Sequence, residues 1–322
     1  MTAGLRRVRL TGIGEHRPAH REDNTAVAAR TESSDEWIRT RSGIATRGIA
    51  ADDESTVDMA VSAGAKALAA AGTDAADVDL VLLATCSMPG PLPGGAPQVA
   101  SRLGALSAGA FDVAAGCAGF TYALSSAADA VRAGSARTVL LTASEKFTPM
   151  LDPYDRGTAF LFGDGAGAVV VTAAPDGDDG PDGVGPVVWS HDGAQHPLFV
   201  IDGSPPIARM EGRALFRWAV SSLPAMARTA CERAGLTTDE LGGIVLHQAN
   251  LRIVDAVVRA LKLPTDTAVA RDVVDSGNTS AASVPLALAR LIERGEITSG
   301  DPVLLLGFGA GLTAAGQVVR CP

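Results

Sequence analysis

The chain has 322 residues, of which 47% are hydrophobic and 20% charged, so it is long enough for two domains and is neither collagen-like nor low in complexity. The formal net charge of −9 argues against nucleic acid as a general partner. No apolar run reaches the ~18 residues of a membrane span and no secretory signal opens the chain, so we expect a cytoplasmic protein without membrane contact.

Short apolar runs alternate along the chain with segments of helical length. Buried strands are expected at residues 79–85, 138–142, 167–171, 244–246 and 303–306, and helices at residues 56–71, 119–133, 214–234, 251–261 and 284–294. The apolar runs are continuous, as in strands that are covered on both faces of a sheet. The alternation of strand and helix predicts an α/β fold.

The two halves of the sequence repeat one arrangement. Gly116 and Gly277 each precede a helix-length segment, and these segments end at Gly134 and Gly295. A buried apolar run follows in both cases. Because the matching features keep the same order at an offset of roughly half the chain, we expect two halves that are built alike. The alternative is a chance similarity between the two halves, of the kind that any α/β chain can show.

A segment rich in Asp, Gly and Pro separates the two halves. It covers residues 173–186 and has no apolar period, so we expect a surface loop. We therefore divide the chain into residues 1–172 and 173–322.

Cys117 follows an apolar run and a turn of small residues, and a helix is expected directly after it. A helix N-terminus favours the thiolate, and the small neighbours would let a substrate approach the sulfur closely. Cys117 is therefore a candidate nucleophile, with a buried structural cysteine as the alternative.

We expect structural roles for Cys86, Cys231 and Cys321. The wide spacing of the four cysteines argues against a zinc site and a disulfide framework.

Two further residues are candidates because of their positions. His247 directly follows the strand expected at 244–246, at the carboxyl end where ligands bind in open α/β sheets. Asn278 occupies the position in the second half that Cys117 occupies in the first. Each has a plainer interpretation, since a lone His is more often structural and Asn is common at turns and helix caps. If the halves pack about a pseudo-twofold axis, the three side chains converge at one interface.

The motifs around these residues are DVAAGCAGFTYAL, LHQANLRI and SGNTSAASVPLAL, and DEWIRTRSGI, FGDGAGA and GFGAG accompany them in the chain. Together, and in this order, they closely resemble the β-ketoacyl-acyl-carrier-protein synthase III family of thiolase-fold condensing enzymes. The resemblance implies the thiolase fold, in which duplicated βαβ-type halves form a five-layered αβαβα arrangement. It also implies a homodimer, no metal and no permanently bound cofactor.

The resemblance implies an acyltransferase reaction in two stages. The Cys117 thiolate takes an acyl group from an acyl-CoA, and malonyl-acyl carrier protein then loses CO2 and attacks the acyl-cysteine, in ping-pong fashion. His247 and Asn278 would donate hydrogen bonds to the malonyl thioester oxygen. The backbone N–H groups of Cys117 and Ala310 would form a second oxyanion hole.

Other functions stay open at this point. Some relatives with the same fold move an acyl group to a hydroxyl, an amine or a carrier protein without condensation, and several of them have Asp in place of Asn278. A non-catalytic binding protein with a degenerate site is another alternative. A papain-like protease is disfavoured, because Cys117 lacks the C-G-[SA]-C-[WY] context.

Six residues match the family's contacts with the coenzyme A substrate. They are Trp37 and Arg156 for the adenine, Arg41 and Arg252 for the phosphates, and Gly212 and Phe216 for the pantetheine tunnel. The residue types agree with the resemblance, because adenine needs an aromatic or guanidinium face and phosphate anions need cations. Arg217, Arg252 and Arg259 are expected to form a basic patch that docks the acidic carrier protein.

Three residues match the family's acyl pocket: Leu92, Phe147 and Phe162. Leu92 is expected to reach across the dimer. Because Leu92 is smaller and Phe147 bulkier than the residues common at these positions, we expect a non-standard primer, which the sequence does not identify. Selection of a polyketide starter unit and initiation of fatty-acid synthesis remain alternatives.

Overall fold

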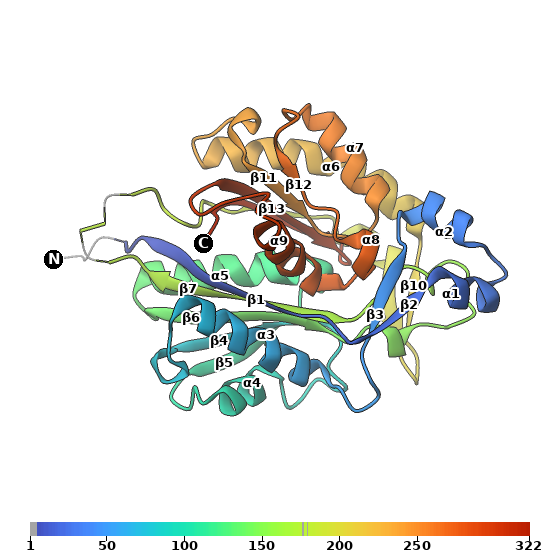
Figure 1. The fold of residues 1–322 in the computed structure, drawn as a ribbon, viewed down its shortest axis with the longest axis horizontal. Coiled ribbons are helices and arrows are strands. Elements are labelled where there is room, and N and C mark those ends of the chain that lie inside the picture. Colours follow the sequence, from blue (N-terminus) through green and yellow to red (C-terminus); the bar gives the residue numbers. More distant parts are fainter. Residues whose placement is uncertain (1–4, 176, 179) are drawn as a thin grey trace.

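The structure is a computed structural model that describes residues 5–175, 177–178 and 180–322. Two five-stranded sheets organise these residues (Figure 1). The first has the order β1-β7-β6-β4-β5, with bounds Val8–His16, Gly165–Ala173, Thr138–Glu145, Leu80–Ala84 and Gly109–Val113. The second has the order β12-β11-β13-β14-β8, with bounds Ala268–Val269, Gly243–Leu246, Pro302–Gly309, Thr313–Arg320 and Val188–His191.

The two sheets share one pattern of strand directions. Strands β5, β4 and β6 run parallel in the first sheet, as β12, β11 and β13 do in the second. The next two pairings are antiparallel in both sheets. This duplication is the arrangement that the sequence repeat predicts. The chain passes from the first sheet to the second between β7 and β8, and we propose residues 1–172 and 173–322 as the two halves.

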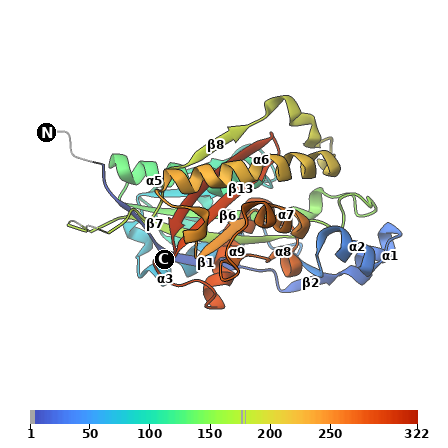
Figure 2. The same cartoon turned by 90° about the horizontal axis from the view of Figure 1, so that it is seen from above.

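Helices complete a five-layered arrangement (Figure 1). The outer helices are α3 (Thr56–Ala71) and α4 (Ala96–Leu103) on the first sheet and α6 (Gly212–Arg233) and α7 (Leu251–Leu261) on the second. The middle layer consists of α5 (Gly119–Ala133) and α9 (Ser283–Glu293), which contact strands of both sheets. Figure 2 shows α6 crossing β13 on the outer side of the second sheet. The predicted αβαβα arrangement is therefore confirmed.

The middle layer is built from small and aliphatic side chains. In α5, Ala123, Ala127 and Ala128 are fully buried, and nearly the whole of α9 is buried. Strands β4, β6 and β11 are covered on both faces, which is why they appear in the sequence as continuous apolar runs. Because α5 and α9 pack against both sheets, they fix the ends of the two sheets relative to each other.

Shorter elements gather beside one end of the two sheets (Figure 1). They are β2 (His20–Asp23), α1 (Asn24–Thr31), α2 (Asp35–Ser42), β3 (Thr46–Ile49), β9 (Phe199–Asp202), β10 (Ile207–Met210) and α8 (Val273–Ser276). Several of them border the cavity described below. None of the described helices is both long and apolar enough to cross a membrane.

The expectation of a plain surface loop at 173–186 is wrong for its last residues. Val184 is fully buried and forms a β-bridge with Val319. The Gly183 N–H donates to the carbonyl of Val8 at 2.7 Å. These contacts tie the first strand of one sheet to β14 of the other, and the composition of the segment gives no sign of them.

Candidate active site

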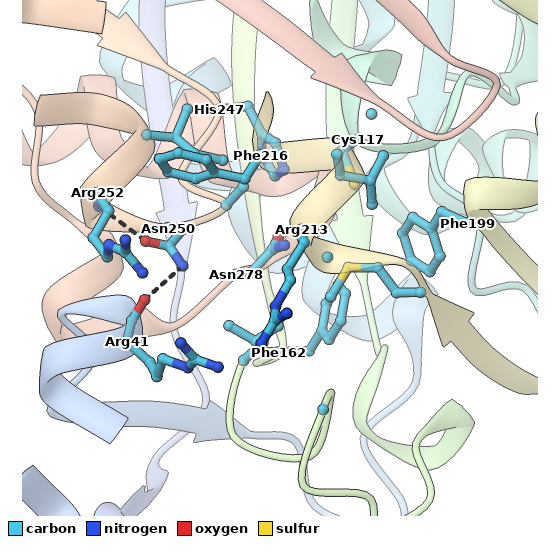
Figure 3. A pocket seen from close by; sticks show the side chains of 18 of the residues that line it. Arg41, Cys117, Phe162, Phe199, Arg213, Phe216, His247, Asn250, Arg252 and Asn278 are labelled. Carbon is cyan, nitrogen blue, oxygen red and sulfur yellow. Dashed lines mark hydrogen bonds between the residues drawn. The ribbon is translucent and has the colours of Figure 1, made fainter. Parts of the chain in front are cut away.

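A cavity of about 900 Å³ opens where the two halves meet (Figure 3). Cys117 from the first half and His247 and Asn278 from the second all line it. All three are nearly buried, with 4%, 2% and 5% of their surface exposed. The structure therefore brings together the three residues that the sequence singles out.

Cys117 lies in a 3-10 turn, Gly116–Ala118, that leads directly into α5. Gly116 has a φ of +52°, which favours glycine at the entry to this turn. Burial raises the pKa of the Cys117 thiol to about 12, which opposes the thiolate that the helix dipole is expected to favour. A nucleophilic role for Cys117 would therefore need a proton acceptor.

The end of β13 packs directly against the Cys117 turn. A Cβ atom on Gly309 would lie 2.7 Å from the Cβ of Cys117, and one on Gly307 would overlap the hydroxyl of Thr121. Only glycine fits at these two positions. This close approach also places Ala310 beside the turn, since a Cβ on Gly116 would lie 3.7 Å from the Ala310 nitrogen. The N–H groups of Cys117 and Ala310 remain our prediction for one oxyanion hole.

His247 continues β11 by one residue, and its N–H donates to the carbonyl of Leu306 at 2.8 Å. Burial lowers the pKa of the imidazole to about 3, so the ring is neutral. Its Nδ1 lies 2.6 Å from the Oγ of Ser283, which already accepts the N–H of Gln248. In the tautomer in which the Ser283 hydroxyl donates to Nδ1, the imidazole carries its proton on Nε2.

Asn278 is held by its backbone and by its side chain. Its N–H donates to the carbonyl of Leu161, and its own carbonyl accepts from Gly163. The side-chain Oδ1 accepts the N–H of Ser280 at 2.9 Å. That bond fixes the amide orientation and leaves Nδ2 as the donor on the cavity side. His247 and Asn278 therefore both offer neutral N–H donors to a bound oxygen.

The mouth of the cavity is strongly basic. Five arginines line it, namely Arg41, Arg156, Arg213, Arg217 and Arg252, and the described lining contains no carboxylate. Asn250 joins two sides of this mouth, because its side chain donates to the carbonyl of Arg41 and accepts the N–H of Arg252 (Figure 3). Arg213 and Asn250 are not among the residues predicted to contact coenzyme A. Asn250 lies within the quoted LHQANLRI motif, whereas nothing in the sequence singles out Arg213.

The predicted adenine site is closed in this structure. The guanidinium carbon of Arg156 lies 4.6 Å from the centre of the Trp37 ring, and that of Arg41 lies 5.4 Å from it. A base can enter between Trp37 and Arg156 only after these side chains separate. Phe216 lines the cavity beneath Arg252, whose guanidinium carbon lies 5.3 Å from the ring centre, and Gly212 also lines the cavity.

The arginines expected to dock a carrier protein are divided by the structure. Arg217 and Arg252 line the cavity, whereas Arg259 is exposed on α7 outside the described lining. A carrier-docking role for this group remains a prediction.

The predicted acyl-pocket residues occupy three different environments. Phe162 lines the cavity, and Phe147 stacks behind it at 4.2 Å between ring centres without lining the cavity itself. Phe199 from β9 also lines the cavity, although no sequence pattern singles it out. Leu92 is 86% exposed and lies outside the cavity of its own chain. Its expected contact across a dimer remains a prediction.

Comparisons with known proteins agree with this geometry. The family model described as 3-oxoacyl-[acyl-carrier-protein (ACP)] synthase III matches residues 111–193, and the model of its C-terminal part matches residues 231–321. The chain is 50% identical over 314 residues to β-ketoacyl-[acyl-carrier-protein] synthase III 2 of Streptomyces avermitilis, covering 98% of this chain and 99% of the relative. It is 45% identical over 332 residues to the mycobacterial synthase III of Mycobacterium tuberculosis, covering 100% and 98%.

The chain belongs to the 3-oxoacyl-[acyl-carrier-protein] synthase III family. Solved structures of synthases agree. The priming β-ketosynthase of the R1128 polyketide biosynthetic pathway superimposes with a TM-score of 0.96 at 44% identity, covering 100% of this chain and 98% of that one. The synthase III of Pseudomonas aeruginosa superimposes with a TM-score of 0.93 at 38% identity, covering 98% and 99%.

The close approach of β13 to Cys117 leads to a first prediction for this synthase. Gly309→Ala adds a methyl group 2.7 Å from the Cys117 Cβ and 3.0 Å from its nitrogen, so the turn must shift. A displacement of about 1 Å can reduce a rate ~10²-fold, and we expect a loss of that size in Cys117 acylation, measured by intact-protein mass spectrometry over time. Gly193→Ala, whose added atom meets nothing closer than 4.0 Å, is the control. Equal acylation of both variants would contradict the argument.

Proposed function

We propose that this protein is a synthase III-type condensing enzyme that is primed at Cys117 by an acyl-CoA and then condenses the acyl group with malonyl-acyl carrier protein. The observation that carries the proposal is the convergence of Cys117, His247 and Asn278 on one cavity with an arginine-lined mouth. Membership of the synthase III family, at 50% identity over nearly the whole chain, supports it.

In the first stage, the Cys117 thiolate attacks the thioester carbon and CoA leaves. The arginines at the mouth suit the phosphates of CoA, because guanidinium groups bind phosphate oxygens with charge-assisted hydrogen bonds. The carbonyl oxygen becomes an oxyanion during the attack, and the N–H groups of Cys117 and Ala310 would stabilise it. The product of this stage is an acyl-cysteine.

In the second stage, the malonyl thioester loses CO2 and the resulting carbanion attacks the acyl-cysteine. His247 Nε2 and Asn278 Nδ2 would donate to the thioester oxygen, where the enolate charge develops. Because the His247 pKa is near 3, the imidazole acts as a neutral hydrogen-bond donor rather than as an acid. Preorganised donors in a site that excludes water stabilise such a charge strongly.

Acyl transfer without condensation is the alternative, and it is not favoured. The relatives reported above are synthases. The fixed amide of Asn278 supplies a neutral donor for an enolate, whereas an ionised carboxylate at that position would repel the enolate.

The likeness to a priming ketosynthase of a polyketide pathway supports starter-unit selection as the role of this protein, with fatty-acid initiation as the second possibility.

We also propose a homodimer that forms through β5. This strand is the edge of the first sheet, and Phe111 on it is 50% exposed. Asp112 accepts the N–H groups of Gly95 and Ala96, which draws the loop that carries Leu92 up against the same edge. An unpaired edge with exposed apolar side chains favours pairing with a second copy. Leu92 would then meet the partner chain.

The proposed reaction predicts that substitution of Cys117 abolishes acylation, whereas substitution of Asn278 slows the release of CO2. Incubation with a panel of acyl-CoAs should add the mass of one acyl group, and Cys117→Ala should abolish the gain. Asn278→Ala should still be acylated but release CO2 from malonyl-acyl carrier protein ~10²–10³-fold more slowly, because one oxyanion donor is lost. Acylation of wild-type protein without any release of CO2 would favour simple acyl transfer.

The dimer proposal predicts that a charge at the edge of the first sheet disrupts association. Phe111→Glu should raise the dimer dissociation constant at least ~30-fold, the size of a hot-spot residue, in sedimentation velocity experiments. Trp189→Glu is the matched control, since Trp189 is 47% exposed on β8 at the edge of the second sheet. A wild-type monomer, or a Phe111→Glu dimer of normal strength, would refute the proposal.

A further inference from the structure

The side-chain amide of Asn278 can serve a developing enolate in only one of its two orientations. One orientation presents the Nδ2 donors to the cavity, and the other presents the Oδ1 acceptor, which would repel the negative charge. The backbone hydrogen bonds of Asn278 with Leu161 and Gly163 do not select between these orientations. The selection comes from the N–H of Ser280, whose nitrogen lies 2.9 Å from Oδ1 and can only donate.

Ser280 has a backbone conformation that residues with a side chain rarely adopt. Its φ is +49°, in the left-handed region that favours glycine, and such strain persists only where the surroundings enforce it. The chain is held on both sides, because the backbone of Asn278 is fixed and the helix α9 that follows is almost wholly buried. A return of φ to negative values would therefore turn the planar peptide group between Thr279 and Ser280. The N–H would then point away from Asn278 Oδ1.

A carboxylate from the other half of the chain holds the Ser280 side chain. Glu145, the last residue of β6, is fully buried, and its Oε1 accepts the Ser280 hydroxyl at 3.0 Å. The carboxylate itself is fixed from beyond the end of β4. There the Thr85 hydroxyl and the Cys86 N–H each donate to Oε2 at 3.1 Å. The position of the Ser280 hydroxyl is thus defined by two strands of the first sheet.

We propose that Glu145 is a positioning residue for Asn278. By accepting the Ser280 hydroxyl, Glu145 keeps Ser280 in the left-handed conformation and keeps its N–H on Asn278 Oδ1, so that Nδ2 faces the substrate. Glu145 does not touch the substrate in this role, and the described lining of the cavity does not include it. The inference rests on the proposed function in assigning Asn278 to the second stage, the loss of CO2 from the malonyl thioester.

A group that only accepts hydrogen bonds suits this position. Burial raises the pKa of Glu145, whereas the hydrogen bonds from Cys86 and Ser280 act to lower it. Hydrogen bonds to an ionised carboxylate are stronger than those between neutral groups. The bond to Glu145 can therefore oppose the backbone strain at Ser280 better than a bond to a neutral side chain would.

The Cys86 thiol belongs to the same cluster and has a lesser part in it. It lies 3.3 Å from Glu145 Oε1 and 3.7 Å from the Ser280 hydroxyl oxygen. A thiol is a weak donor and a weak acceptor, so it holds either group less firmly than a hydroxyl or an N–H does. The backbone N–H of Cys86 remains on the carboxylate whatever the side chain is.

Ser280→Ala and Ser280→Gly form a pair in which backbone strain decides the outcome. Both remove the hydroxyl, but glycine adopts a φ of +49° freely and alanine does not. Ser280→Ala should release CO2 from malonyl-acyl carrier protein ~10-fold more slowly than the wild type, the effect of one strained residue that is no longer held. Ser280→Gly should stay within about threefold of the wild type, since it keeps the N–H without strain. Equal rates of the two variants would overturn the proposal.

Two controls accompany this pair. Acylation of Cys117 by an acyl-CoA, followed by intact-protein mass spectrometry, should be unchanged in both variants, because that stage does not use the Asn278 amide. A loss of acylation as large as the loss of CO2 release would overturn the proposal. Lys262 is exposed and also has a positive φ, of 56°. Lys262→Ala and Lys262→Gly should release CO2 equally fast, and a difference like that at Ser280 would mean that strain acts through general stability.

Glu145→Met removes the acceptor and keeps an unbranched side chain of similar length. It should slow CO2 release ~10-fold when Ser280 is present, for the same reason as Ser280→Ala. Combined with Ser280→Gly it should add little, because glycine needs no anchor, and such non-additivity is expected of coupled residues. Equal losses in the two backgrounds would overturn the proposal. Cys86→Ala should behave as the wild type, and a loss as large as that of Glu145→Met would assign the anchor to the thiol instead.

Hydrogen exchange tests the anchor without any activity measurement. The peptide that contains Ser280 should exchange faster in Glu145→Met and Ser280→Ala than in the wild type, because the N–H leaves its acceptor. Peptides from α3 report whether a variant is folded, and if Glu145→Met does not fold, the Ser280 pair decides alone. Unchanged exchange in both folded variants would overturn the proposal. A wild-type protein that releases no CO2 would refute the proposed function, whereas exchange would still show whether Glu145 holds Ser280.

Discussion

The contact between β13 and the turn that carries Cys117 is the constraint on which the rest of the site depends. Cys117, the proposed nucleophile, comes from one half of the chain, and the proposed hydrogen-bond donors His247 and Asn278 come from the other. Because Gly307 and Gly309 have no side chains, the strand can lie directly on the turn. The middle helices α5 and α9 then hold the sheets at a separation set by small residues. The catalytic geometry is thus a consequence of how two similar halves pack.

Burial determines the charges within this site. The His247 imidazole and the Asn278 amide are neutral, and burial raises the pKa of the Cys117 thiol. Arginines lie at the exposed mouth, whereas the carboxyl group of Glu145 is fully buried and burial raises its pKa. A developing enolate would therefore meet donors that need not reorganise, while the phosphates of a substrate would meet cations at the rim. The cations lie at the rim and the neutral donors lie deeper in the cavity, so phosphate binding and enolate stabilisation would take place at different depths.

Much of this arrangement can be predicted from the sequence. The helices expected at 56–71, 119–133 and 251–261 have the observed bounds, because glycine or a polar residue marks their ends and apolar runs flank them. The repeat and the family motifs alone single out Cys117, His247 and Asn278. Continuous apolar runs located the central strands, although the short strand β12 and the edge strand β8 have no comparable signal.

Other features depend on tertiary contacts that no local pattern records. The hydrogen bonds of Ser280 and Ser283 arise where separate elements meet, so the SGNTSAAS motif alone does not assign their roles. The dipole argument for Cys117 leaves out desolvation, which raises the pKa of the thiol. Phe147 matches a pocket position but lies one layer behind Phe162.

The closed contact between Arg156 and Trp37 has a consequence for substrate binding. The two substrates of the proposed reaction share a pantetheine arm, but only CoA carries adenine, so only CoA has to break a cation–π contact that is worth ~0.5–1 kcal/mol at exposed sites. When CoA departs, the contact reforms behind it. Acyl-CoA and CoA therefore bear the same small cost at this contact, whereas a carrier-bound substrate bears none.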